Sequence, residues 1–281
     1  MGLAAAGLSL TAVAGNYWQG VGRTLPVSPQ GNVVAVSCHN CYGSSNADTQ
    51  AQVAMALGRD FDLVELDLTV HSDGQVYVEH DRSEAAVGTL AQALANPALQ
   101  QSNRLLFLEL KGNYTTPADS DALVLGVLRA IRDGGYATAK RPATLRAFMD
   151  GNNRQQHLVR AKSLLSLAEF AGIRSYVRFH SLLRSDVLNG IRISKQMGLE
   201  GVELEYRTPD LAAGLQLARQ LGLGVGVFTT PASEGERYLL GLRDEVDFIT
   251  TDYDRAQTAA ARSVRSLIQA NLPSNHAEGA P

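Results

Sequence analysis

The segment 60–81, DFDLVELDLTVHSDGQVYVEHD, places two carboxylates, Glu65 and Asp67, two residues apart near the end of an apolar run. Residues with this spacing in a β-strand point to the same face. A third carboxylate, Glu109, ends the later run RLLFLEL. Carboxylates that converge in a confined site repel one another unless a cation lies among them, and oxygen ligands suit Mg²⁺ or Ca²⁺. We therefore predict that Glu65, Asp67 and Glu109 bind one divalent cation.

Two histidines, His39 and His80, flank Glu65 and Asp67 along the sequence. His39 ends the apolar run 32–39, and His80 follows a turn at 72–74 that is expected to fold a short hairpin back over the site. Phosphodiester cleavage needs one group that takes the nucleophile's proton and one that protonates the leaving alcohol, while a metal and Lys111 neutralise the phosphoryl oxygens. We predict that His39 and His80 are the catalytic pair, with the acid and the base unassigned, and that Lys111 binds substrate.

The remaining histidines and two further glutamates are weaker candidates for the site. His180 ends a predicted strand and is a second candidate for the same site, whereas His71 is expected to be exposed and His157 to lie in a helix. Glu203 and Glu205 also share a strand face, and a structural role is as plausible for them as a role in substrate specificity.

Short β-rich apolar runs alternate with longer segments of helical periodicity, which is typical of repeated βα units around a parallel sheet. Eight such runs predict an α/β fold of the TIM (β/α)8 barrel type, with a small β-hairpin insertion after the second strand. An open doubly wound sheet is the alternative, but no glycine-rich phosphate loop follows the first strand. The predicted strands are 32–39, 62–68, 104–110, 143–149, 174–180, 201–206, 222–230 and 246–252.

The 281 residues are expected to form one barrel domain over 26–270, preceded by an N-terminal arm or signal-peptide remnant over 1–25 and followed by a flexible tail over 271–281. Ala-Val-Ala before Gly15 resembles a signal-peptidase site, which predicts a secreted or periplasmic protein. A helix of small residues packed on the domain is the alternative. Cys38 and Cys41 form either a local disulfide or two free thiols.

The net charge of −3 and the absence of long basic runs argue against nucleic acid as a partner. No segment approaches the roughly 20 apolar residues that a membrane span requires. The expected partner is a small-molecule or lipid phosphodiester, with transient contact to a membrane surface allowed, and the sequence predicts no particular oligomeric state.

The motifs HNCYGSSNADT, LVELDLTVHSDGQVYVEHD, LFLELKGN, GVGVFTT and VDFITTD together resemble the glycerophosphodiester phosphodiesterase family from Val33 to Asp252. This resemblance implies a TIM barrel and a divalent metal held by a Glu-x-Asp pair and a later Glu. It also implies two catalytic histidines and a phosphate-binding lysine at the positions already named. It assigns Asn40 and Phe228 to substrate binding.

The chain departs from the family pattern at two of these positions. His39-Asn40-Cys41 stands where the family has His-Arg-Gly, so Asn40 replaces an arginine, and Phe228 stands in place of a tryptophan. The predicted function is metal-dependent hydrolysis of glycerophosphodiesters to a glycerol phosphate and an alcohol. Cleavage of (lyso)phospholipid headgroups, as by the similar sphingomyelinase D-like phospholipases, and a catalytically silent ligand-binding barrel are the alternatives. A Schiff base on Lys111 is disfavoured, because neighbouring acids raise a lysine's pKa.

Overall fold

The computed structural model of the chain describes residues 17–39, 49–81, 88–112, 116–149, 154–231, 235–252 and 263–271. The strands in these ranges are β1 (Ala35–Cys38), β2 (Leu63–Val70), β3 (Val76–Val78), β4 (Leu105–Leu110), β5 (Ala143–Phe148), β6 (Val177–Leu183), β7 (Gly201–Glu205), β8 (Gly224–Thr230) and β9 (Phe248–Thr251).

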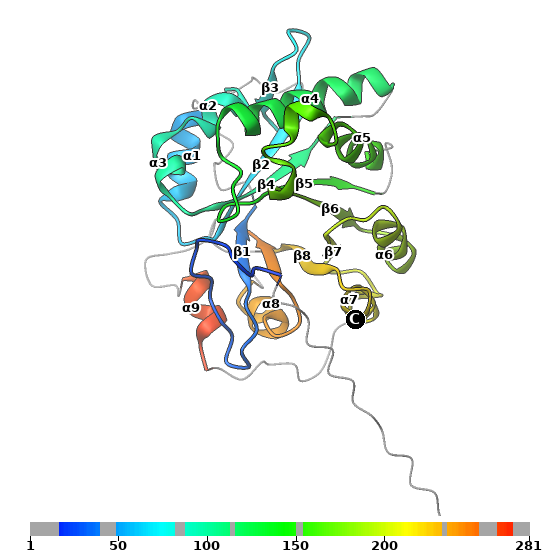
Figure 1. Ribbon diagram of the computed structural model, residues 1–281. Helices are drawn as coiled ribbons and strands as arrows, with labels where there is room; N and C mark the ends of the chain where they lie inside the picture. The colour runs from blue at the N-terminus through cyan, green and yellow to red at the C-terminus, as the bar shows by residue number, and fades with distance from the viewer. Residues whose placement is uncertain are drawn as a thin grey trace, which may run out of the picture.

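Eight of these strands form a closed parallel ring. The hydrogen-bonded order runs from β1 through β9, β8, β7, β6, β5 and β4 to β2, and β2 pairs with β1 to close it. Strand β3 lies outside the ring, antiparallel to β2, so the two form the predicted hairpin, which projects at the top of Figure 1. The predicted TIM barrel with its hairpin insertion is confirmed.

The helices lie outside the strands (Figure 1) and bury one apolar face each. The longest begins at a capping box in which Thr116 and Asp119 satisfy each other's backbone N–H groups, and it has proline at its first position. The described helices are α1 (Thr49–Leu57), α2 (Leu90–Leu94), α3 (Pro97–Gln101), α4 (Pro117–Asp133), α5 (Gln155–Leu165), α6 (Val187–Gln196), α7 (Leu211–Gln220), α8 (Gly235–Leu242) and α9 (Val264–Gln269), with 3₁₀ turns at Ala168–Phe170 and Arg174–Tyr176.

Aromatic side chains from the N-terminal arm close one end of the barrel. Trp18 is buried and packs with Leu63, Phe107 and Phe248, and its Nε1 donates a hydrogen bond of 2.6 Å to the carbonyl oxygen of Asp247. The arm is therefore part of the fold from Tyr17 onward. Residues 1–16 lie outside the described ranges, so the signal-remnant interpretation stays a prediction.

Two glycines on β8 leave space for the aromatic rings at this closed end of the barrel. A Cβ on Gly224 would lie 2.4 Å from the ring of Tyr17, and one on Gly226 would lie 2.0 Å from the ring of Phe248. Real side chains never approach so closely, so the run GLGVGVF supplies space on the interior face of β8 and apolar contacts on the other.

All eight predicted ring strands are present, and one differs in its position. The run 174–180 was expected as the fifth ring strand, whereas Arg174–Tyr176 forms a 3₁₀ turn and β6 covers Val177–Leu183. Strand pairing decides this boundary, because Val177 is the residue that lies opposite Ala143, the first residue of β5.

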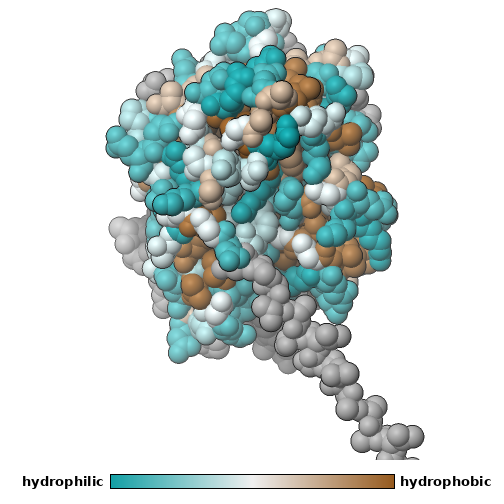
Figure 2. All heavy atoms as spheres, viewed as in Figure 1, coloured by the Kyte–Doolittle hydropathy of each residue, from teal (hydrophilic) through white to brown (hydrophobic). Residues whose placement is uncertain are grey.

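The face shown in Figure 2 mixes hydrophilic areas with small separate hydrophobic ones. The large hydrophobic side chains exposed in the described ranges are Val27, Val159 and Leu167. No helix in the described part of the chain is long and apolar enough to cross a membrane.

Candidate active site

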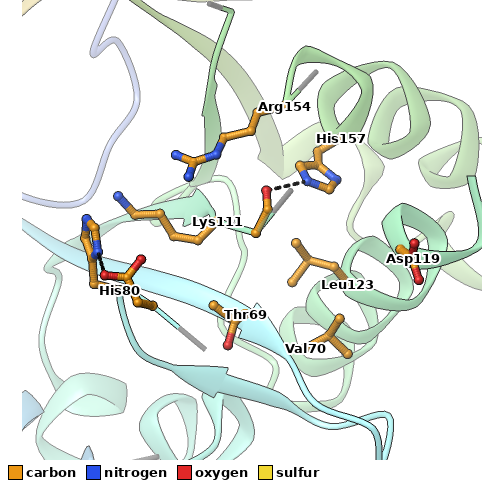
Figure 3. A pocket seen from close by; sticks show the side chains of 10 residues that line it. Thr69, Val70, His80, Lys111, Asp119, Leu123, Arg154 and His157 are labelled. Carbon is orange, nitrogen blue, oxygen red and sulfur yellow. Dashed lines mark hydrogen bonds and ion pairs between the residues drawn. The ribbon is translucent and has the colours of Figure 1, made fainter. Parts of the chain in front are cut away.

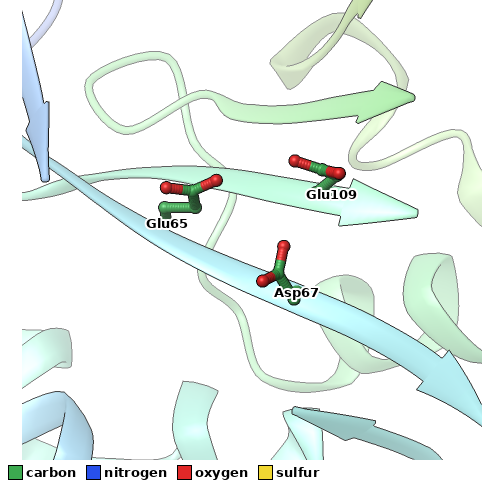
Figure 4. Close-up of side chains that lie close together, drawn as sticks. All are labelled: Glu65, Asp67 and Glu109. Carbon is green, nitrogen blue, oxygen red and sulfur yellow. The ribbon is translucent and has the colours of Figure 1, made fainter. Parts of the chain in front are cut away.

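Three buried carboxylates gather between β2 and β4, as Figure 4 shows. Glu65 and Asp67 share the interior face of β2, and Glu109 lies opposite Asp67 in the parallel pairing with β4. One ligand oxygen from each of the three lies within 4.8 Å of the others. Oxygens bound to one Ca²⁺ lie 2.3–2.6 Å from the ion and hence at most about 5 Å apart. The three carboxylates predicted from the sequence therefore lie together at a spacing that suits one divalent cation.

Lys111 follows Glu109 by two residues and lies on the same face. Its Nζ is 3.3 Å from Oδ1 of Asp67 and also contacts Glu109. Burial acts to lower the pKa of Lys111, but the charges of Glu109 and Asp67 outweigh it, so the pKa is raised. Lys111 is therefore a fixed positive charge and not an amine nucleophile, as the sequence had indicated.

Arg146 on β5 enters the same interior and was not singled out in the sequence. Its guanidinium contacts Glu65, lies 3.3 Å from Oε2 of Glu109 and donates a hydrogen bond of 2.8 Å to Glu203 on β7. The signal was present in the run ATLRAF, because Thr144 and Arg146 have the same two-residue spacing as Glu65 and Asp67.

The charges of this interior cluster favour a divalent cation. Glu65, Asp67, Glu109 and Glu203 carry four negative charges against two positive charges on Lys111 and Arg146, which leaves an excess of two. Burial, and then the charge of Asp67, raise the pKa of Glu109.

One carboxylate oxygen of Glu65 also favours a bound cation. Oε2 of Glu65 is buried and has no hydrogen-bond partner among the described residues. Because buried carboxylate oxygens are normally satisfied by a donor or an ion, this oxygen and the charge excess fit a bound divalent cation.

His39 lies directly after β1 and is held by an acid from the other end of the chain. Its Nδ1 is 2.9 Å from Oδ1 of Asp252, which follows β9. A carboxylate only accepts hydrogen bonds, so Nδ1 carries the hydrogen and Nε2 is the position at which the ring gains or loses a proton. This is the arrangement that a general acid or base requires.

His80 is placed by the hairpin. The backbone N–H of Glu79 donates to the carbonyl oxygen of Asp67 at 2.9 Å, so the next residue lies near the level of the acidic cluster. Nδ1 of His80 is 2.9 Å from Oδ2 of Asp81, which fixes its tautomer as Asp252 does for His39. In each of the two predicted catalytic histidines, Nδ1 is therefore paired with an aspartate carboxylate.

A buried polar contact stabilises this hairpin. The carboxylate of Glu79 accepts a hydrogen bond from Thr69 and lies 2.5 Å from Nε2 of His71. His71 was expected to be exposed; it is partly buried against Glu79, because the antiparallel register sets β2 and β3 side by side.

A pocket of about 410 Å³ lies beside His80 and Lys111. Figure 3 shows its lining, in which Arg154 extends to the same side as Lys111 and His80. Arg154, the residue before α5, and His157, in its first turn, both contribute to this lining. The pocket is large enough for a small polar alcohol or its phosphate ester.

Several predicted positions lie elsewhere. His180 is not at the mouth: it is fully buried in mid-strand, where its Nε2 hydrogen-bonds the hydroxyl of Tyr17, because β6 extends three residues beyond its predicted end. Phe228 is buried near the mouth, 5.6 Å from the ring of Phe148, and its role in substrate binding stays a prediction. Asn40 lies outside the described residues.

Cys38, the residue before His39, is disulfide-bonded. The chain has one other cysteine, Cys41, which lies outside the described ranges. The two-thiol alternative is therefore wrong for Cys38.

The fold and the site define a TIM barrel with a buried acidic cluster between β2 and β4 and two histidine–carboxylate pairs that follow β1 and β3. No protein-family model matches the sequence, and no curated protein matches it closely enough to count as a relative.

Solved structures do share the fold. A putative glycerophosphoryl diester phosphodiesterase from Silicibacter pomeroyi has a TM-score of 0.60 at 17% identity, over 84% of this chain and 94% of its own. A phosphodiesterase from Oleispira antarctica, solved with the product sn-glycerol-3-phosphate, has a TM-score of 0.59 at 16% identity, over 78% and 93%. The fold implied by the motif resemblance is thus confirmed.

A chemically unrelated enzyme has a similar fold. A GH18 chitinase from Pseudoalteromonas aurantia matches with a TM-score of 0.50 at 8% identity, over 77% of this chain and 93% of its own. Fold alone does not determine chemistry, so an argument for function has to rest on the residues of the site.

Proposed function

We propose that the chain is a metal-dependent phosphodiesterase that hydrolyses glycerophosphodiesters to a glycerol phosphate and an alcohol. The observation that carries this proposal is the convergence of Glu65, Asp67 and Glu109, with ligand oxygens within 4.8 Å, beside Lys111. The product-bound phosphodiesterase of the same fold supports the substrate class.

In the proposed mechanism, His39 and His80 move the protons. One ring takes a proton from the glycerol hydroxyl next to the phosphate as that oxygen attacks phosphorus, and the other protonates the alcohol as its P–O bond breaks. Water then opens the cyclic phosphate with the two roles reversed. Lys111 neutralises a phosphoryl oxygen throughout.

The acidic cluster would hold a divalent cation, Mg²⁺ or Ca²⁺, through Glu65, Asp67 and Glu109, and that ion would supply further positive charge for the phosphoryl oxygens. Arg146 keeps two of these carboxylates in place. Asp252 and Asp81 orient the two histidines, so that each presents Nε2.

Export from the cytoplasm is part of the proposal. It is supported by the disulfide at Cys38, because disulfides persist chiefly in oxidising compartments.

The test is hydrolysis of glycerophosphocholine and lysophosphatidylcholine by the purified chain, with Mg²⁺ or Ca²⁺ and then with EDTA, followed by ³¹P NMR. We expect glycerol phosphate from the first substrate, and loss of turnover in EDTA. A cyclic or lipid phosphate from the second substrate would instead support headgroup cleavage. No turnover of either by folded protein would support the silent barrel.

Substitution of the histidines tests their roles. His39→Ala and His80→Ala should each lower kcat by roughly 10²–10⁴-fold without loss of folding, as judged by circular dichroism. His276→Ala, in the tail, is the matched control. Unchanged kcat in both site variants would remove the histidines from the mechanism.

A further inference from the structure

Three cationic side chains lie around one aromatic ring at the mouth of the barrel. The ring centroid of Phe148, the last residue of β5, is 4.1 Å from Cζ of Arg184, 6.0 Å from Cζ of Arg154 and 6.0 Å from Nζ of Lys111. The positions come from three elements: Lys111 follows β4, Arg154 precedes α5 and Arg184 follows β6.

The alternation of β6 accounts for the position of Arg184. His180 faces the barrel interior, so Leu182 and Arg184 follow on the same face at two-residue steps. Leu182 packs with Phe148 and Phe228 in a small cluster. Arg184 therefore continues this face beyond the cluster, where its side chain is exposed and stacks on Phe148.

The charges of the three cations are compensated to different extents. Lys111 is paired with Asp67 and Glu109. Arg154 and Arg184 have no ion pair with any carboxylate in the described part of the chain, and Nε of Arg154 is buried without a hydrogen-bond partner. Two like charges over one ring repel each other, and a bound anion would relieve this.

The acids near the pocket do not compensate these arginines. The carboxylate of Asp81 is bonded to His80, and that of Asp119 accepts hydrogen bonds from Thr116 at the start of α4. The first turn of α5, which follows Arg154, contains no acidic residue, so its backbone N–H groups add partial positive charge beside the pocket.

The charge balance points to a second anionic group on the substrate. With a divalent cation the interior cluster becomes neutral, and a phosphodiester brings one negative charge. Arg154 and Arg184 bring two further positive charges that no carboxylate of the described residues pairs with, so one of these two charges remains after the phosphodiester is bound.

We propose that Arg154 and Arg184, arranged around Phe148, form a subsite for an anionic group on the alcohol part of the substrate. The preferred substrates are then glycerophosphodiesters whose alcohol carries a carboxylate or a phosphate. This inference rests on the proposed function and names the substrate class of the same site.

The test uses glycerophosphoserine and glycerophosphoethanolamine, which differ by one carboxylate. The wild type should favour the serine diester by about tenfold or more in kcat/KM, since charge-assisted hydrogen bonds are among the strongest. Arg154→Gln and Arg184→Gln should each bring this ratio toward one through loss of activity on the serine diester. Arg192→Gln, on the exposed side of α6, is the matched control.

Two results would overturn the proposal: no preference in the wild type, or an equal loss on both substrates in the arginine variants, which would assign the arginines to the scissile phosphate. A second pair of substrates, glycerophosphoinositol and its 4-phosphate, differs by one phosphate. Comparison of its kcat/KM ratio with that of the serine and ethanolamine diesters shows whether a phosphate or a carboxylate is the preferred second anion.

A binding measurement separates this inference from the proposed function. If neither diester is hydrolysed, the proposed function fails, and calorimetry with O-phosphoserine and O-phosphoethanolamine still tests the subsite. The proposal expects phosphoserine to bind about tenfold more tightly, with the difference lost in Arg184→Gln. Equal or absent binding of the two compounds overturns it.

Discussion

Replacement of Arg146 by methionine should destabilise the barrel more than any single surface charge. The side chain is 2% exposed, and its partners Glu65 and Glu203 are 1% and 0% exposed. Methionine keeps much of the volume but removes the charge that faces these carboxylates and Glu109. Removal of one partner from a buried ion pair typically costs about 3–5 kcal/mol, because the other charge is left uncompensated.

We expect this loss, about 3–5 kcal/mol in the free energy of unfolding, in EDTA at pH 7.5, measured by urea denaturation and circular dichroism. Glu203→Gln in the same chain should recover part of it, because one of the uncompensated charges is then absent. Arg129→Met is the surface control: that arginine is 51% exposed in its pair with Glu169, so about 0–1 kcal/mol is expected.

The change in stability on adding Ca²⁺ is a second test of the same charged cluster. An ion that binds only the folded state stabilises it by about 2.7 kcal/mol at one hundred times its dissociation constant. Arg146 shares Glu65 and Glu109 with the proposed ion, so its removal should make the Ca²⁺-induced stabilisation larger in Arg146→Met than in the wild type. A loss below about 1 kcal/mol in EDTA would refute the account of Arg146 as the buried counter-charge.

Trp18→Ala should lower the free energy of unfolding by about 3–5 kcal/mol, because the indole fills the closed end of the barrel. A loss of less than about 1 kcal/mol, measured by urea denaturation, would show that Trp18 does not close the barrel in this way. Burial lowers the pKa of His157 and of His180, so below about pH 6.5 the unfolded chain binds more protons and stability falls as pH falls, by up to about 1.4 kcal/mol per pH unit for each ring. His157→Gln should remove one such share of the slope between pH 6.5 and 5, and an unchanged slope would show that His157 does not titrate in this way. Glu79→Gln should cost about 1.5–3 kcal/mol in thermal or urea unfolding, because a charged acceptor to Thr69 is lost; an unchanged midpoint would exclude Glu79 as the support of the hairpin.

The ring strands and the acidic cluster were predictable because both depend on local patterns. Strand runs and helical periodicity alternate along the sequence, and residues two apart share a face wherever the strand lies. Glu65 and Asp67 therefore had to point the same way, and adjacent parallel strands had to bring Glu109 to them. None of these steps required knowledge of distant contacts.

The contacts of Arg146 and the position of His180 could not be predicted from sequence alone, although the strand pattern indicated which way Arg146 faces. The role of Arg146 depends on the distance across the barrel from β5 to β2 and β7, which closure of the ring sets. The position of His180 depends on where β6 begins, and that is fixed by its register with β5 and not by its own β propensity.

The likeness to a chitinase shows that this barrel permits more than one chemistry, so the choice lies in the residues on the inner faces of the strands. Here charged residues from β2, β4, β5 and β7 meet in the interior, a place that barrels usually fill with branched apolar side chains. Their net excess of two negative charges links stability to the proposed function: any substitution that changes a charge in this interior changes both the stability of the barrel and its affinity for a divalent cation.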